Sequence, residues 1–144
     1  MSSRGVKERP ERLLFVLCSV SRASVRAQSV RIKTRDGSSL STAAGFTGVV
    51  SGRVEILHAG LWGSVCSTGW GMEEARVVCT QLGFPASVNF LSAARDESSM
   101  DSGTGPIWMG RLRCMGTEPS LSACAGFGFG IHAQGCSHAD DAGV

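Results

Sequence analysis

The sequence lacks tyrosine, contains only 4 prolines, and has few aromatic and charged residues, at 6% and 18%. With 42% hydrophobic residues, this low charge excludes a wholly disordered chain, because enough apolar surface is present for a packed core. No apolar run approaches the roughly 18 to 20 residues that span a bilayer, so we expect no transmembrane helix in this chain. The 144 residues do hold 19 glycines and six cysteines, a profile typical of one turn-rich, cross-linked domain.

Positive charge is scarce in most of the chain. Residues 1–35 carry nine of the 14 Lys and Arg and only two acids, a local balance of +7. Residues 36–144 carry five Arg and ten acids, a balance of −5. A nucleic-acid-binding protein concentrates its basic residues on the folded part, and this chain does the reverse. We therefore expect no nucleic-acid partner.

The first 27 residues have the layout of a targeting segment. Basic residues at 4–12 precede the apolar stretch Leu13–Val20, and the small-residue patterns 21–23 and 25–27 follow it. This order predicts a secretory signal peptide over residues 1–27, with an unstructured basic leader as the alternative. Over residues 28–51 we expect a first strand followed by a flexible Ser/Gly-rich insertion.

From Gly52 onward the patterns predict an α+β domain with long loops. The alternation from Arg53, the turn at Ala59-Gly60 and the return to Cys66 predict a hairpin. An apolar stripe at helical spacing predicts a helix over 72–82 that ends at Gly83. A buried strand at 107–109 and a second short apolar piece at 112–114 follow a polar loop at 86–106. A short helix capped by Thr117 and holding Leu121 and Cys124 comes next.

The cysteines favour a disulfide framework. No Cys-x-x-Cys pair is present, and the intervals between cysteines match no common zinc site. Because Cys18 lies in the segment predicted to be removed, the mature chain would keep an odd number, listed as Cys66, Cys79, Cys114, Cys124 and Cys136. An odd count implies that one cysteine has its partner elsewhere.

Several sequence blocks, in the same order, resemble the scavenger receptor cysteine-rich (SRCR) domain. They are Gly52–Ile56, Trp62–Cys66, Ala75–Cys79, Gln81–Pro85, Gly103–Trp108, Cys114–Glu118 with Leu121 and Cys124, and Cys136–Val144. Val50 and Phe84 stand where an eight-cysteine subgroup has cysteine, so the chain resembles the six-cysteine group A type. The resemblance implies an α+β fold in which a curved antiparallel β-sheet cradles one main α-helix. From the resemblance we expect residues 52–144 to form an SRCR domain.

The resemblance also implies how the cysteines pair. It joins Cys66 to Cys136 and Cys114 to Cys124. It leaves Cys79 with a partner two residues beyond Val144, so we expect the domain to be incomplete at its C-terminus.

Candidate ligand-binding residues depart from the pattern of the family, many members of which bind calcium. The expected acidic pairs are replaced by Ser67-Thr68 and Gly110-Arg111, and Asp140 and Asp141 remain. We expect no cofactor except a weak, degenerate calcium site at these two aspartates, which alternatively serve as turn residues. Arg111, Arg113 and Arg95 form a small basic spot that is either an anion site or solvated surface.

Other residues have simpler interpretations. Trp62, Trp70 and Trp108 are expected in the core rather than in a binding surface. His132 and His138 have no nucleophile-elbow serine to serve, so the sequence does not indicate a hydrolase.

Two function classes remain, both without catalysis in this chain. The first is a noncatalytic extracellular module of a scavenger-receptor-like or secreted recognition protein, which binds proteins or polyanions. The second is an accessory domain of a larger extracellular enzyme of serine protease or lysyl oxidase type. Either places the chain outside the cell or on the extracellular face of a membrane, and the parent protein could be membrane-anchored.

Overall fold

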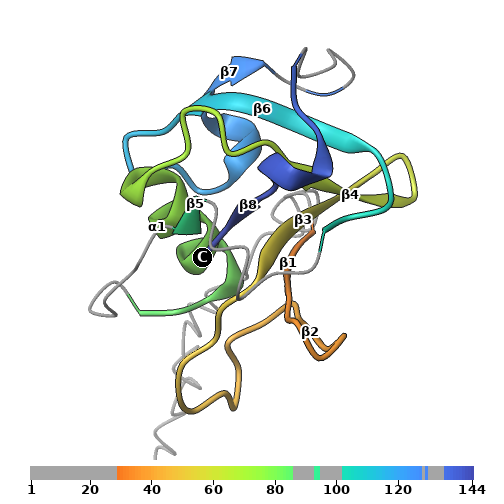
Figure 1. Ribbon diagram of the computed structural model, residues 1–144. Coiled ribbons are helices and arrows are strands. Elements are labelled where there is room, and N and C mark those ends of the chain that lie inside the picture. The colour runs from red at the N-terminus through yellow and green to blue at the C-terminus, as the bar shows by residue number, and fades with distance from the viewer. Residues whose placement is uncertain (1–28, 86–92, 95–101, 128, 130–134) are drawn as a thin grey trace, which may run out of the picture.

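A computed structural model describes residues 29–85, 93–94, 102–127, 129 and 135–144 (Figure 1). The expected leader, residues 1–27, lies outside the described residues, and so do Arg95 and His132. None of the helices in the described part of the chain has the length and apolar character that crossing a membrane requires.

The described strands form a curved sheet with the order β2-β1-β3-β4-β6-β7, and β8 pairs with both β3 and β5. Their bounds are β1 Val30–Lys33, β2 Ser39–Leu40, β3 Arg53–His58, β4 Leu61–Val65, β5 Ala93–Ala94, β6 Ile107–Arg113, β7 Ala125–Phe127 and β8 Ala142–Gly143. β4 and β6 pair in parallel, whereas the other neighbours are antiparallel. The sheet is therefore mixed rather than antiparallel throughout, because the long segment that contains α1 returns the chain beside β4 in the same direction.

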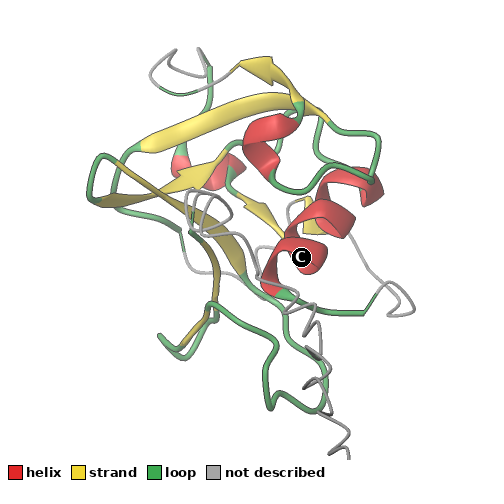
Figure 2. Ribbon diagram, turned by 180° about the vertical axis from the view of Figure 1, so that it is seen from behind, coloured by secondary structure: helices red, strands yellow, loops and turns green. Residues whose placement is uncertain are grey.

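The main helix, α1, covers Met72–Leu82, as the apolar stripe predicted. The Glu74 carboxylate accepts a hydrogen bond from the Gly71 amide at 2.8 Å and so satisfies one free donor at the helix start. At the other end Gly83 has φ 91°, a left-handed conformation that favours glycine. The helix lies beside the curved sheet (Figure 2), which confirms the α+β arrangement.

The core fills the space between α1 and the sheet. Its members come from most elements of the described chain, and they include Ile32, Val54, Ile56, Val65, Val77, Val78, Leu82, Met109, Leu112, Leu121, Ala142 and Val144. Through Ala142 and Val144, the C-terminal residues pack in the same cluster as α1. The face of β3 that carries Arg53 and Glu55 is also buried.

Three local predictions were wrong. The strand predicted at 107–109 does not end there but continues to Arg113 as one strand, β6, with an irregularity in its pairing. The short helix is a 3-10 turn, Leu121–Ala123, that begins after Ser120 rather than at Thr117. β5 lies inside the segment that was expected to be loop only, because its pairing to β8 depends on residues distant in the chain.

Candidate functional site

Two disulfides are formed in the structure. One joins Cys66, after β4, to Cys136, and the other joins Cys114, after β6, to Cys124. These are the two pairs that the resemblance implies. Cys79 is a free thiol on the buried side of α1, and burial raises its pKa to about 11. At neutral pH this thiol is therefore protonated and unreactive.

Asp140 lies next to the Cys66–Cys136 bond, in the 3-10 turn His138–Asp140. Its carboxylate accepts hydrogen bonds from the amide and the hydroxyl of Ser137, both at 3.1 Å. Its backbone oxygen accepts from the Ser67 amide at 2.7 Å. Asp140 thus closes a turn and holds the loop that follows β4.

Asp141 is 4% exposed, and its carboxylate oxygens face three groups of the fold. Oδ2 accepts a hydrogen bond from the Gly103 amide at 2.9 Å, lies 3.1 Å from His138 Nδ1, and lies 3.8 Å from Arg53 Nε. A buried carboxylate is stable only with such partners. The side chain therefore anchors the segment around Gly103 to the end of the chain.

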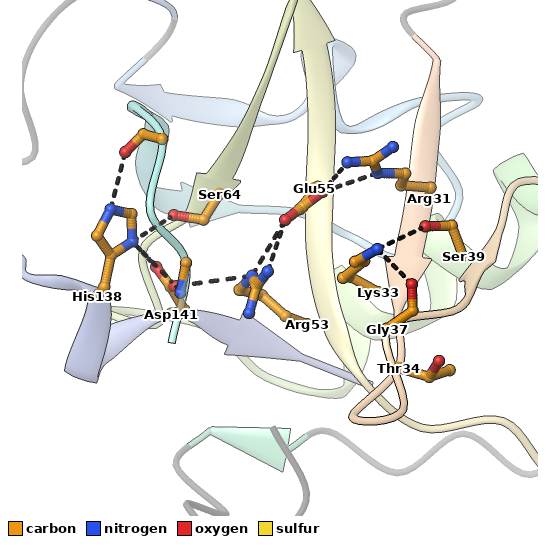
Figure 3. Close-up of polar contacts among 12 residues, drawn as sticks. Arg31, Lys33, Thr34, Gly37, Ser39, Arg53, Glu55, Ser64, His138 and Asp141 are labelled. Atoms are coloured by element: carbon orange, nitrogen blue, oxygen red, sulfur yellow. Dashed lines mark hydrogen bonds and ion pairs between the residues drawn. The ribbon is translucent and has the colours of Figure 1, made fainter. Parts of the chain in front are cut away.

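Arg53 extends this set of contacts across the sheet. Its guanidinium binds Glu55 at 2.7 Å, and Glu55 also binds Arg31 of β1 at 2.6 Å (Figure 3). Arg31 and Glu55 are direct cross-strand partners in the register of β1 and β3. We call Arg31, Glu55, Arg53, Asp141 and His138 the ion-pair network.

Glu55 has opposing influences on its pKa. Burial raises the pKa of this carboxyl, but hydrogen bonds from Arg53 and Arg31, together with their charges, lower it by more. The net effect is a lowered pKa. The carboxylate is thus held in its charged form.

Ser64, His138 and Asp141 lie together, but not as a catalytic triad. In a triad the two ring nitrogens have separate partners, the carboxylate on one side and the serine on the other. Here Nδ1 faces both Asp141 and Ser64, the latter at 3.4 Å, while Nε2 donates to the Gly105 carbonyl at 2.8 Å. The nitrogen that faces Ser64 therefore also faces the carboxylate, and the other nitrogen is bonded to a backbone carbonyl, so the ring is not placed as the base of a triad.

The loop where the resemblance expects an acidic pair contains hydroxyl groups instead. The Thr68 hydroxyl contacts Cys66 Sγ at 3.3 Å, and the Thr68 amide donates to the same sulfur at 3.4 Å. Within the described residues, the one group that brings three candidate metal ligands together is Cys114, Glu118 and Cys124. Two of these are disulfide-bonded, and Glu118 accepts from the Met115 and Thr117 amides.

The basic spot is partly described. Arg111 and Arg113 are both exposed on β6, and Arg95 lies outside the described residues. Arg111 has φ 51°, one of two positive φ values among the described residues other than glycine. This conformation could not be predicted from the residue type, since a left-handed residue is ordinarily glycine, asparagine or aspartate.

The tryptophans differ in position. Trp70 is buried and donates to the Gly143 carbonyl at 2.9 Å, as a core residue would. Trp108 is partly buried, and Trp62 lies outside the core with Arg31 4.0 Å above its ring. The prediction of a core position was therefore wrong for Trp62, whose face binds a cation.

An aromatic cluster at the tip of the β3–β4 hairpin escaped the sequence analysis. His58 stacks on Phe129 with ring centres 4.0 Å apart, and it meets Trp108 edge-on at 4.9 Å. These residues are distant in the sequence, and no motif connects them.

Comparisons with known proteins agree with the geometry. The family model described as the scavenger receptor cysteine-rich domain matches residues 45–144. The chain is 44% identical over 93 residues to human "Lysyl oxidase homolog 4" and 44% identical over 94 residues to human "CD5 antigen-like". Each match covers 65% of this chain, but only 12% and 26% of those two proteins.

Two solved structures resemble the fold. The dimeric form of the SRCR domain of mouse MARCO aligns with a TM-score of 0.55 at 33% identity, covering 68% of this chain and 87% of that one. The third SRCR domain of murine neurotrypsin aligns with a TM-score of 0.55 at 34% identity, covering 65% and 81%.

Proposed function

The chain belongs to the scavenger receptor cysteine-rich domain family, and from this premise we propose that it is a noncatalytic extracellular module that binds polyanionic or protein ligands. One observation carries the choice of ligand. Arg111 and Arg113 are exposed on one strand, whereas Glu55, Asp140 and Asp141 accept hydrogen bonds within the fold. The described surface of β6 thus offers positive charge that an anionic group would bind.

We propose further that this binding does not depend on calcium. Calcium needs six to eight oxygen ligands, several of them carboxylates. Asp140 closes a turn, Asp141 is buried beside Arg53, and Ser67 and Thr68 supply hydroxyls only. Arg111 stands where a second acidic pair would lie, and its charge repels a cation. The domain alone should therefore bind calcium no more tightly than millimolar.

Both proposals, anion binding and its independence of calcium, are tested by measuring heparin binding on a biosensor surface. The protein used is the full chain, secreted with its disulfides formed. We expect the dissociation constant to rise with salt and to be the same in EDTA and in calcium. Binding that appears only with calcium would contradict the metal-independent proposal.

Calorimetric titration with calcium gives a direct control. The unmodified chain should release little heat, whereas the variant Ser67→Asp, Thr68→Asp should bind calcium more tightly if the surrounding fold is intact. Tight binding by the unmodified chain would mean that backbone carbonyls build a site without those carboxylates.

A second candidate is an accessory domain in a larger extracellular enzyme. The observation that favours it is 44% identity to human lysyl oxidase homolog 4 and 47% to mouse lysyl oxidase homolog 3. Each match lies within 93 residues, a small part of either protein. Sequencing transcripts past the codon for Val144 separates the candidates, since an oxidase or protease domain there favours the accessory role. Further SRCR copies or a membrane span would favour a receptor.

A further inference from the structure

The two disulfides differ in the groups that surround their sulfur atoms. A carboxylate oxygen of Glu118 lies within 4.8 Å of the sulfurs of both Cys114 and Cys124. Hydrogen bonds from backbone amides, above all that of Met115, lower the pKa of this carboxyl, so it is negatively charged at neutral pH. A thiolate that approaches the Cys114–Cys124 bond is therefore repelled by a charge of its own sign.

The Cys66–Cys136 bond has hydrogen-bond donors beside it instead. The Thr68 amide donates to Cys66 Sγ at 3.4 Å, and the Thr68 hydroxyl lies 3.3 Å from the same sulfur and 3.7 Å from Cys136 Sγ. Among the described residues, no carboxylate or histidine nitrogen lies within 4.8 Å of both sulfurs of this bond. Thr68 belongs to the pair that stands where the resemblance expects two acids, so a hydroxyl donor here takes the place of a carboxylate.

The two cysteines of this bond are unequally accessible. Cys66 is 2% exposed, whereas Cys136 is half-buried and lies between the exposed residues Gly135 and Ser137. In thiol–disulfide exchange a thiolate attacks one sulfur, and the other sulfur leaves as a thiolate. Access therefore makes Cys136 the sulfur that is attacked and Cys66 the one that leaves. The leaving sulfur is also the one that the Thr68 amide and hydroxyl contact at the shorter distances.

We propose that Cys136 is a site of reversible modification by low-molecular-mass thiols, and that Thr68 promotes this reaction. The attacking thiolate forms a bond to Cys136 Sγ, the bond between the two cysteines breaks, and its electron pair leaves on Cys66 Sγ. The products are a mixed disulfide at Cys136 and a Cys66 thiolate, so one disulfide replaces another without an oxidant or reductant. The Thr68 donors stabilise the negative charge that forms on Cys66. Attack of Cys66 on the mixed disulfide reverses the step.

The test measures the initial rate at which reduced glutathione is incorporated into the full chain at neutral pH without denaturant. The reaction is stopped with acid, free thiols are blocked with N-ethylmaleimide, and the adducts are located by peptide mapping. Cleavage by chymotrypsin after Phe127 and Phe129 separates Cys136 from both cysteines of the other disulfide. We expect the adduct at Cys136 to form about tenfold faster than adducts at the other disulfide, since glutathione carries a net negative charge that Glu118 repels.

Substitutions at Thr68 test its part in the reaction. Thr68→Val keeps the shape of the side chain and removes the hydroxyl, so the Cys136 adduct should form about fivefold more slowly. Thr68→Ser keeps the hydroxyl and should keep the rate. Thr80→Val makes the same change on the exposed side of α1 and should leave the rate unchanged. Melting temperatures of all variants show whether each is folded at the temperature of the reaction.

Cysteamine, a thiol with a positive charge, tests the part of Glu118. It should narrow the difference in rate between the two disulfides, because the carboxylate attracts it. An unchanged difference would show that Glu118 does not protect the second bond. Equal rates at the two disulfides with glutathione would mean that thiols react with the unfolded chain, and would overturn the proposal. Adducts mainly at Cys66 would reverse the assigned direction of attack, and an unchanged rate in Thr68→Val would remove Thr68 from the reaction.

Discussion

Two charged regions of the domain are built in opposite ways. The ion-pair network lies across β1, β3 and the turn before β8, with Arg53, Glu55 and Asp141 all less than 10% exposed. Its groups face one another at hydrogen-bonding or ion-pair distances. Residues 110–113, which we call the β6 bulge because three steps along β6 correspond to two along β7, instead carry two exposed arginines, Arg111 and Arg113. The backbone of Arg111 is left-handed, with φ 51°.

This contrast indicates which charged groups a ligand can reach. A buried carboxylate with several partners is fixed by the fold, and removing one partner leaves an uncompensated charge. An exposed arginine adds little to stability, and a ligand can reach it. Stability should therefore depend on the ion-pair network and ligand binding on the β6 bulge, with little overlap.

The largest expected effect is the loss of the disulfide beside the ion-pair network. In the loop-entropy model, Cys66→Ala with Cys136→Ala costs about 4 kcal/mol, and Cys114→Ala with Cys124→Ala costs about 3 kcal/mol. The first disulfide is expected to contribute more because its cysteines are 70 residues apart in the sequence, whereas those of the second are 10 apart. Denaturant unfolding of the two double variants measures both losses of free energy of unfolding. The reverse order would show that native-state contacts, not loop length, dominate.

A new disulfide at Cys79 should produce the next largest change. Two residues ending in cysteine, added after Val144, would join α1 to the strand that follows the ion-pair network. We expect a gain of about 3 kcal/mol and a melting temperature several degrees higher. Non-reducing peptide mapping must show the new bond. An unchanged melting temperature with the bond present would mean that core packing alone already fixes α1.

Loss of the Glu55 carboxylate should cost slightly less. Glu55→Ala leaves Arg53 buried with fewer partners, and we expect the free energy of unfolding to fall by about 2–3 kcal/mol. Glu73→Ala, which removes an exposed carboxylate in the first turn of α1, should change it by less than about 1 kcal/mol. Equal effects of the two substitutions would remove the distinction between buried and exposed charge.

Acid should weaken the ion-pair network selectively. Because the folded-state pKa of Glu55 is lowered, its stabilisation is present above the unfolded-state pKa and is lost as pH falls through the folded-state value. Unfolding free energies measured from pH 6 to pH 3 should therefore decline less steeply in Glu55→Gln than in the unmodified chain. Parallel curves would assign the acid sensitivity to other carboxyls, such as Asp36, whose pKa hydrogen bonds from Thr34 and Ser38 lower to about 2.

The smallest effect concerns the second left-handed residue. Ala59 in the β3–β4 turn has φ 50°, and Ala59→Gly should raise the free energy of unfolding by about 0.5–1 kcal/mol. Ala44→Gly, at an exposed alanine whose own φ is not positive, is the matched control and should lower it slightly. Heparin binding should stay the same in both variants. A loss of binding in Ala59→Gly would extend the ligand surface to the hairpin.

Local sequence patterns predicted the elements that local chemistry determines. The stripe Ala75, Val78, Cys79 and Leu82 placed α1, and Ala59-Gly60 placed the β3–β4 turn. Contacts between distant residues were not predictable in this way. The parallel pairing of β4 with β6, and the meeting of Arg53 with Asp141, depend on how the chain returns across the sheet.

The candidate site was predictable only in part. Arg111 and Arg113 stand out in a segment poor in basic residues, so composition was enough to select them. The bulge between Gly110 and Arg113 depends on the register of β6 against β7, which has no local signature. The sequence alone likewise could not predict that the Asp141 carboxylate contacts the Gly103 amide and the His138 ring, because both contacts come from the folded geometry.

One paired measurement tests the separation of the two regions most directly. The free energy of unfolding and the heparin dissociation constant are determined at pH 7 for the unmodified chain, for Glu55→Gln, and for Arg111→Gln with Arg113→Gln. We predict that Glu55→Gln loses stability and keeps its heparin affinity at temperatures where it is folded. The arginine double variant should keep its stability and lose binding about tenfold or more. Loss of heparin affinity in folded Glu55→Gln, with binding retained in the arginine variant, would contradict the assignment of ligand binding to the β6 bulge.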